Sequence, residues 1–282
     1  MNELKDIPYH RGPIRDPFRE FDLYYQKSSD VALPPLICFV HGGAWRSEDK
    51  APLFQIDHSN LARNLVSATT IPVIVPNYRL SSGSNGVRHP NHAEDILELL
   101  VFITTASLEL PRVFDPFKIY LISHSCGAHM LASIVLDSAS IFPTLTPPST
   151  VLNAIQGIIL SEGIYDIDRL LLDFPAYHSW FITEAFNDKP SYAATNTTNL
   201  GLRSQSSIRW LIIHSKGDTL VNVAQSEAMF AHLQSLYGGL TGQTMWSNTD
   251  ELTQEHDALL STSTYLHIVV DFIKGANYVL AA

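Results

Sequence analysis

One serine of the chain has the sequence surroundings of a catalytic nucleophile. The segment Ser123-His124-Ser125-Cys126-Gly127 lies between an apolar run and a helical pattern. In a tight turn from a strand to a helix, the hydroxyl of such a serine projects over the edge of the sheet, and the helix N-terminus faces the reacting oxygen. We therefore interpret Ser125 as a nucleophile. Ser123 stands where the common pattern G-x-S-x-G has its first glycine, and serine is small enough for that position.

A glycine turn earlier in the chain could supply an oxyanion hole. The segment His41-Gly42-Gly43-Ala44-Trp45 directly follows another apolar run. Acyl transfer needs N–H groups fixed toward the developing oxyanion, and glycine lets the backbone approach that closely. We expect the N–H groups of Gly43, Ala44 and Cys126 to form this hole, with Gly42 giving the turn its conformational freedom.

A serine hydroxyl is a weak nucleophile until a base takes its proton, so an imidazole and an orienting carboxylate must follow. In α/β architectures with this type of turn, they come in the order Ser, Asp, His along the chain. Asp218 lies just after the apolar residues 208–214, and His256 follows the last candidate strand. We predict that Asp218 is the carboxylate and His256 the base, with Asp166 as the alternative carboxylate.

The other histidines fit structural roles better than catalytic ones. His232 and His267 fall inside helical patterns, where core or surface positions are expected. A metal site could join His124, Cys126 and His129, but no carboxylate lies at ligand spacing, and His124 precedes the turn that carries the other two. We therefore expect neither a metal nor another cofactor.

The elements that must position these side chains alternate along the chain. Apolar runs typical of buried strands occupy residues 35–40, 71–76, 117–124, 155–160, 208–214 and 244–247, and helical patterns occupy residues 91–104, 126–137, 223–237 and 261–274. This alternation predicts an α/β fold with a mostly parallel sheet covered by helices on both faces. Reactive groups in such folds gather at the carboxyl ends of the strands. We expect one domain over residues 1–282, with an aromatic excursion at about residues 174–200 as a cap.

The composition limits the classes of protein to which the chain can belong. Its 282 residues are 45% hydrophobic and carry a net charge of −10, which excludes overall disorder and argues against nucleic-acid and anionic-membrane partners. The N-terminus lacks an apolar signal segment, and the longest uncharged stretch, residues 138–161, contains prolines and is too polar to span a membrane. Cys38 and Cys126 form no CxxC pair, which is typical of reduced thiols. We expect a cytoplasmic protein, a monomer or a homodimer.

Several segments together resemble a known superfamily. These are HGGAW at 41–45, NYRLS at 77–81, SHSCG at 123–127, EGIYDIDRLL at 162–171, HSKGDTLV at 214–221 and EHD at 255–257. They resemble the α/β-hydrolases, and among these the hormone-sensitive-lipase-like branch and the fungal kynurenine formamidases (arylformamidases). The HGG-x-W pattern, and GIYD with the acidic and aromatic stretch after it, are narrower signals than the triad pattern.

The resemblance implies a small-molecule substrate, N-formyl-L-kynurenine, hydrolysed to L-kynurenine and formate in tryptophan degradation. A formyl group needs no acyl pocket, and an aryl amine leaving group suits an aromatic cleft. Trp45, Tyr165, Tyr177 and Trp180 are candidates to line that cleft, although packing of the cap would explain any one of them equally well.

Two other functions remain open at the level of the sequence. The same triad could serve a general carboxylesterase that acts on short acyl or aryl esters. An inactive hydrolase fold that binds a partner is less favoured, because Ser125, Asp218 and His256 are all present.

Overall fold

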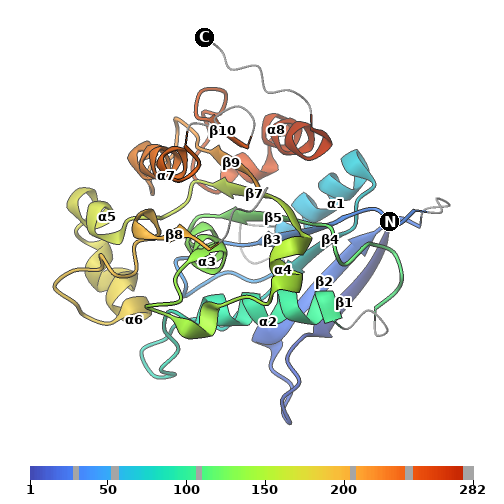
Figure 1. Ribbon diagram of the computed structural model, residues 1–282, viewed down its shortest axis with the longest axis horizontal. Helices are drawn as coiled ribbons and strands as arrows, with labels where there is room; N and C mark the ends of the chain where they lie inside the picture. Colours follow the sequence, from blue (N-terminus) through green and yellow to red (C-terminus); the bar gives the residue numbers. More distant parts are fainter. Residues whose placement is uncertain (28–31, 52–56, 106–109, 204–207, 239–243, 276–282) are drawn as a thin grey trace.

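An eight-stranded sheet forms the centre of the protein (Figure 1). The computed structural model describes residues 1–27, 32–51, 57–105, 110–203, 208–238 and 244–275. The strands are β1 (Asn2–Pro8), β2 (Glu20–Tyr25), β3 (Leu36–Val40), β4 (Val73–Pro76), β5 (Ile119–His124), β7 (Ile155–Ser161), β9 (Arg209–Ile213) and β10 (Met245–Asn248). Their order in the sheet is β1-β2-β4-β3-β5-β7-β9-β10, and a separate pair joins β6 (Leu136–Asp137) to β8 (Gly201–Leu202).

The parallel part of the sheet is the part that the apolar runs predicted. Strands β4, β3, β5, β7, β9 and β10 pair in parallel, and each lies within a few residues of its predicted range. The antiparallel strands β1 and β2 were not predicted. Strand β2 lacks a continuous apolar run because it contains buried acidic residues. Asp22 is 1% exposed and forms ion pairs with Lys5 at 3.0 Å and with Lys50 at 3.3 Å.

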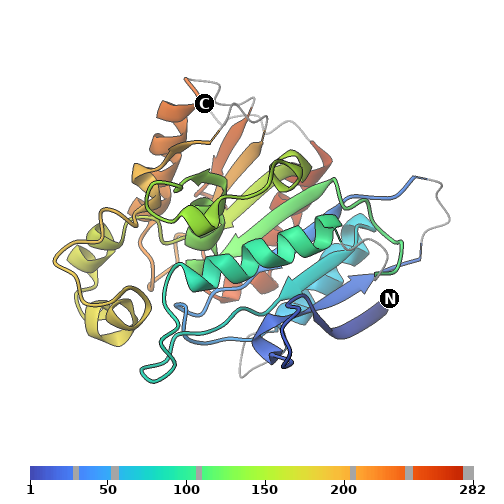
Figure 2. The same ribbon diagram turned by 60° about the horizontal axis from the view of Figure 1, so that its bottom comes forward.

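Helices cover both faces of the sheet, as Figure 2 shows from a second direction. They are α1 (His58–Thr69), α2 (Asn91–Thr105), α3 (Cys126–Val135), α4 (Ser149–Ala154), α5 (Ile167–Asp173), α6 (Thr183–Phe186), α7 (Val223–Leu236) and α8 (Ser263–Lys274). Alternate residues of β3 face opposite layers: Ile37 and Phe39 pack in the core with α1 and α8, whereas Cys38 and Val40 pack with α2 and α3. The predicted α/β fold is therefore confirmed.

The excursion at residues 174–200 contains little regular structure. It holds a single π-helical turn (His178–Ile182), α6 and a short turn at Thr197–Asn199. Figure 1 shows α5 and α6 at the periphery, away from the central strands. Within the described residues, no helix is both long and apolar enough to cross a membrane. Cys38 and Cys126 are buried and free.

Candidate active site

Ser125 lies in a strained turn between β5 and α3. Its backbone has φ 54° and ψ −126°, a conformation that L-residues rarely adopt and that positions nucleophiles in strand-to-helix turns. Glycine is required at position 127, two residues later, because a Cβ there would lie 2.6 Å from the carbonyl oxygen of Val40. Ser123 is fully buried, and its hydroxyl points to the carbonyl oxygen of Ile159 at 3.5 Å. Serine therefore fits at the position where the common pattern has glycine.

The predicted oxyanion turn packs directly against Ser125. Three consecutive residues have left-handed backbone, with φ of 94° at Gly43, 51° at Ala44 and 59° at Trp45. A Cβ on Gly42 would lie only 3.0 Å from Cβ of Ser125. The main chain of this turn therefore borders the carbon that an acyl group on Ser125 would occupy.

The thiol of Cys126 anchors this turn to the start of α3. Its sulfur accepts a hydrogen bond from the N–H of Trp45 at 3.3 Å, and the N–H of Ala44 also faces it. Burial raises the pKa of Cys126 to about 12, so the group remains a thiol at neutral pH. The three predicted donors thus differ: Ala44 faces the sulfur, whereas the N–H groups of Gly43 and Cys126 have no hydrogen-bond partner among the described residues.

Asp218 and His256 are in direct contact. Oδ2 of Asp218 lies 2.7 Å from Nδ1 of His256, and Oδ1 accepts the N–H groups of Leu220 at 2.8 Å and Val221 at 2.9 Å. Burial acts to raise the pKa of Asp218, but the hydrogen bond and charge of His256 and the two N–H donors outweigh it, so this pKa is lowered. The carboxylate is therefore ionised and fixed, with the Nδ1 proton of His256 directed toward it.

Ser125 and His256 line one pocket of about 560 Å³, a size typical of small-molecule sites. Tyr177, Trp180 and Phe181 form its aromatic wall. Among the described residues, no hydrogen bond joins the hydroxyl of Ser125 to His256. Catalytic hydrogen bonds of this kind often tighten only in the complex with substrate.

The predicted cleft aromatics divide into two groups. Tyr177 and Trp180 line the pocket as predicted, but Trp45 and Tyr165 do not. Both are fully buried, and Trp45 packs edge-on against Phe186 with ring centroids 4.9 Å apart. Trp45 and Tyr165 therefore lie in the core and not in the predicted cleft, because residue type does not show on which side of the turn a ring lies.

This difference predicts opposite behaviour for two tryptophans. We expect Trp45→Ala to lower the free energy of unfolding by about 3–5 kcal/mol, because it removes a buried indole from the core. Trp180 is 52% exposed. We therefore expect Trp180→Ala to leave the free energy of unfolding nearly unchanged and to raise KM for an aromatic substrate. Denaturant unfolding and steady-state kinetics of both variants test this. A stable Trp45→Ala variant with a raised KM would contradict the assignment.

The alternative catalytic residues lie in other settings. Asp166 caps α5, where its side chain accepts the N–H of Arg169 at 2.9 Å and the amide of Asn196 at 2.8 Å. His232 donates to the carbonyl of Leu200, and His267 is exposed on α8. The pocket that Ser125 lines is not lined by Asp166, His232 or His267.

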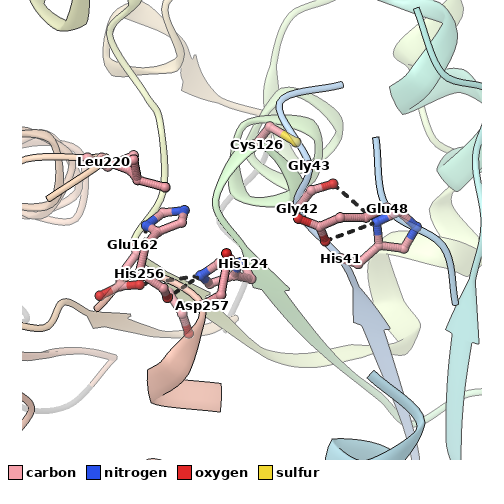
Figure 3. A network of polar contacts seen from close by, with 12 residues as sticks. His41, Gly42, Gly43, Glu48, His124, Cys126, Glu162, Leu220, His256 and Asp257 are labelled. Atoms are coloured by element: carbon pink, nitrogen blue, oxygen red, sulfur yellow. Dashed lines mark hydrogen bonds and ion pairs between the residues drawn. The ribbon is translucent and has the colours of Figure 1, made fainter. Parts of the chain in front are cut away.

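Glu162 and His124 contact His256, although the sequence did not predict a positioning role for either residue. Oε2 of Glu162 lies 3.3 Å from Nε2 of His124 and 3.4 Å from Nδ1 of His256 (Figure 3). Glu162 directly follows β7, so the rule that strand ends gather reactive groups could have found it.

Two groups of described residues bring potential metal ligands within 4.8 Å of one another. They are His41 with Glu48 and His58, and His124 with Glu162 and His256. The combination of His124, Cys126 and His129 is not one of them within the described chain. In the first group, Glu48 already accepts a hydrogen bond from His58 at 2.9 Å.

Comparison with known proteins identifies the family to which the chain belongs. The BD-FAE family model matches residues 21–233. The kynurenine formamidase of Meyerozyma guilliermondii is 33% identical over 203 residues, which are 71% of this chain and 71% of that protein. The kynurenine formamidase of Debaryomyces hansenii is 26% identical, with 80% of this chain and 87% of that protein covered.

Solved structures with a similar fold include esterases. Esterase B from Lactobacillus rhamnosis superposes with a TM-score of 0.75 at 16% identity, covering 97% of this chain and 85% of that one. A fungal esterase from Rhizomucor miehei gives a TM-score of 0.65 at 20% identity, covering 91% of this chain and 77% of that one. These structures have the α/β-hydrolase fold. The chain is thus a hydrolase of the BD-FAE family, and within the α/β-hydrolases it belongs with the kynurenine formamidases of fungal type.

Proposed function

We propose that the protein hydrolyses N-formyl-L-kynurenine to L-kynurenine and formate, a step of tryptophan degradation, with Ser125, His256 and Asp218 as its catalytic triad. One observation carries the proposal: a serine in a strained turn and a histidine bound to a buried carboxylate line the same pocket. The fungal kynurenine formamidases among its relatives support the choice of substrate.

In the proposed mechanism, Oγ of Ser125 attacks the formyl carbon while Nε2 of His256 takes the hydroxyl proton. Asp218 holds the Nδ1 proton of His256, which keeps Nε2 free to act as the base. The N–H groups of Gly43 and Cys126 are free to bind the oxyanion. His256 then gives its proton to the leaving aryl amine, and water activated by the same imidazole attacks the formyl-enzyme and releases formate.

The pocket suits such a substrate in shape and charge. Tyr177 and Trp180 offer aromatic surface to the aryl ring of the leaving group. Arg46, Glu48 and Asp257 also line the pocket and supply charges of both signs for a zwitterionic amino-acid tail.

The proposal extends to the setting of the reaction. The free thiols Cys38 and Cys126 fit a reducing compartment such as the cytoplasm. We infer one hydrolase domain over residues 1–282, acting as a monomer or homodimer, in which residues 174–200 cap the pocket through Tyr177 and Trp180.

We expect kcat/KM for N-formylkynurenine to exceed that for N-acetylkynurenine by at least about 100-fold, since a misplacement near 1 Å can cost that much. The reason is steric, because Gly42 packs so closely against Ser125 that a larger acyl group should clash with the turn. Parallel assays of the two amides and of p-nitrophenyl acetate measure this ratio.

Esterase activity alone does not count against the proposal, because an ester leaving group needs less help from a general acid than an amine does. A ratio near one would point to a general carboxylesterase. So would good ester turnover without any turnover of the formyl amide.

A further inference from the structure

We propose that Glu162 and His124 form a buried pair that positions His256 through its Nδ1 and its main-chain carbonyl and sets the pH range in which this base works. The inference rests on the proposed function of His256 as the base. It concerns two positioning residues, neither of which lines the pocket.

The backbone holds Glu162 in an unusual conformation at the end of β7. Its φ of 50° lies in the left-handed region, which is unfavourable for a residue of this type. Its N–H donates to the carbonyl of Ile213 at 2.8 Å, and its Oε1 accepts the N–H of Ser215 at 3.2 Å. The carboxylate is thereby fixed at the carboxyl ends of the neighbouring strands.

The two side chains contact His256 at both its ring and its main chain. Oε2 of Glu162 is 3.4 Å from Nδ1 of His256, beside the shorter contact from Asp218. Nε2 of His124 lies 3.3 Å from Oε2 of Glu162 and 3.0 Å from the carbonyl oxygen of His256. Since both of these neighbours are acceptors, Nε2 of His124 carries a proton. Figure 3 shows this network meeting between three segments of the chain.

The pair is also charged and excluded from water. Both side chains have no exposed surface. Burial alone would lower the pKa of His124, but the hydrogen bond and charge of Glu162, with the charges of Asp257 and Glu48, raise it to about 9. Burial raises the pKa of Glu162, and the hydrogen bond and charge of His124 oppose that rise. At neutral pH we therefore treat the pair as imidazolium and carboxylate.

The charges of Asp218, Glu162 and His124 sum to zero with that of His256 only when His256 is protonated, as it is during the reaction. Asp218 and Glu162 bring two negative charges to its Nδ1 side, and His124 brings one positive charge. The cluster is short of one positive charge while His256 is neutral, and the proton taken from Ser125 supplies it. Fixed charges that match a charge formed in the transition state are the main source of electrostatic catalysis.

The other titratable groups near this cluster do not change the sign of the argument. His214 lies 3.6 Å from Asp218, and burial lowers its pKa, so it is neutral. Asp257 lies 3.9 Å from Nδ1 of His124 and adds negative charge on the outer side. Tyr265, whose hydroxyl bonds to Ser161, remains protonated because burial raises its pKa.

The test is the pH dependence of kcat/KM in two variants. Glu162→Gln removes the anion 3.4 Å from His256, so the acid limb should move to lower pH by about one unit. His124→Gln removes the cation and keeps an N–H donor, so the same limb should move to higher pH by about one unit. A merely structural role would lower kcat without moving the limb in opposite directions.

The design separates this proposal from the choice of substrate. The rate at which a fluorophosphonate probe labels Ser125 requires the same base, so its pH profile can be measured whatever the natural substrate is. Asp250 is an exposed carboxylate that lies 3.2 Å from Lys216, so Asp250→Asn is the matched control and should leave the acid limb in place. Glu162→Asn, which tolerates left-handed backbone better, serves if Glu162→Gln folds poorly. Unmoved limbs, or limbs that move in the same direction, would overturn the proposal.

Discussion

We expect the Ser125→Ala variant to lose turnover of N-formylkynurenine by roughly 10⁴- to 10⁶-fold, and His256→Ala to lose a similar factor. The hydroxyl oxygen is the only heavy atom that Ser125→Ala removes, and His256→Ala removes the imidazole that activates this hydroxyl. Because the two residues act as a unit, the double variant should be little worse than either single one. Single-turnover and steady-state assays measure these losses.

The control for this experiment is the fold itself. Circular dichroism and the denaturation midpoint should stay near the wild-type values, since Ser125 and His256 line a pocket rather than fill the core. A folded Ser125→Ala protein that kept more than a tenth of its activity would show that the nucleophile is another group.

The second large effect is expected at Asp218. The Asp218→Asn variant should fold normally, because the amide oxygen can still accept the N–H groups of Leu220 and Val221. Its activity should fall by about 10⁴-fold, since a carboxamide that donates to Nδ1 stabilises the wrong imidazole tautomer. Asp166→Asn is the matched control, because that carboxylate caps α5 and lies outside the pocket.

Equal losses in the two aspartate variants, or a larger loss at Asp166, would reverse the assignment of the carboxylate. Measurement of kcat and KM for both variants on one substrate decides between them.

The parallel strands and the turn at Ser125 could be predicted because both follow from local patterns. Continuous apolar runs mark strands that are buried on both faces, and the turn at Ser125 must lie between such a strand and a helix. Strand β2 could not be found in this way, because Asp22 is compensated by Lys5 and Lys50, which pairing brings from other parts of the chain.

The contact between Glu162 and His124 was not predicted for the same physical reason. Glu162 and His124 are far apart in sequence and meet only because β5 and β7 pair with His124 opposite Ser161. The position of Trp45 outside the predicted cleft could not be predicted either, because its left-handed backbone, with a φ of 59°, is a feature that residue type does not reveal. Local chemistry was therefore predictable, whereas contacts set by the register of the sheet were not.

The sulfur of Cys126 connects two segments that are far apart in the sequence, the glycine turn at residues 41–45 and the turn at Ser125. The main chain of Cys126 belongs to the turn that carries Ser125, while its sulfur accepts the N–H of Trp45 in the earlier glycine turn. A residue without a side-chain acceptor at this position would keep the first contribution and lose the second. The glycine turn and the turn at Ser125 should therefore be transferred together when either is moved into another scaffold.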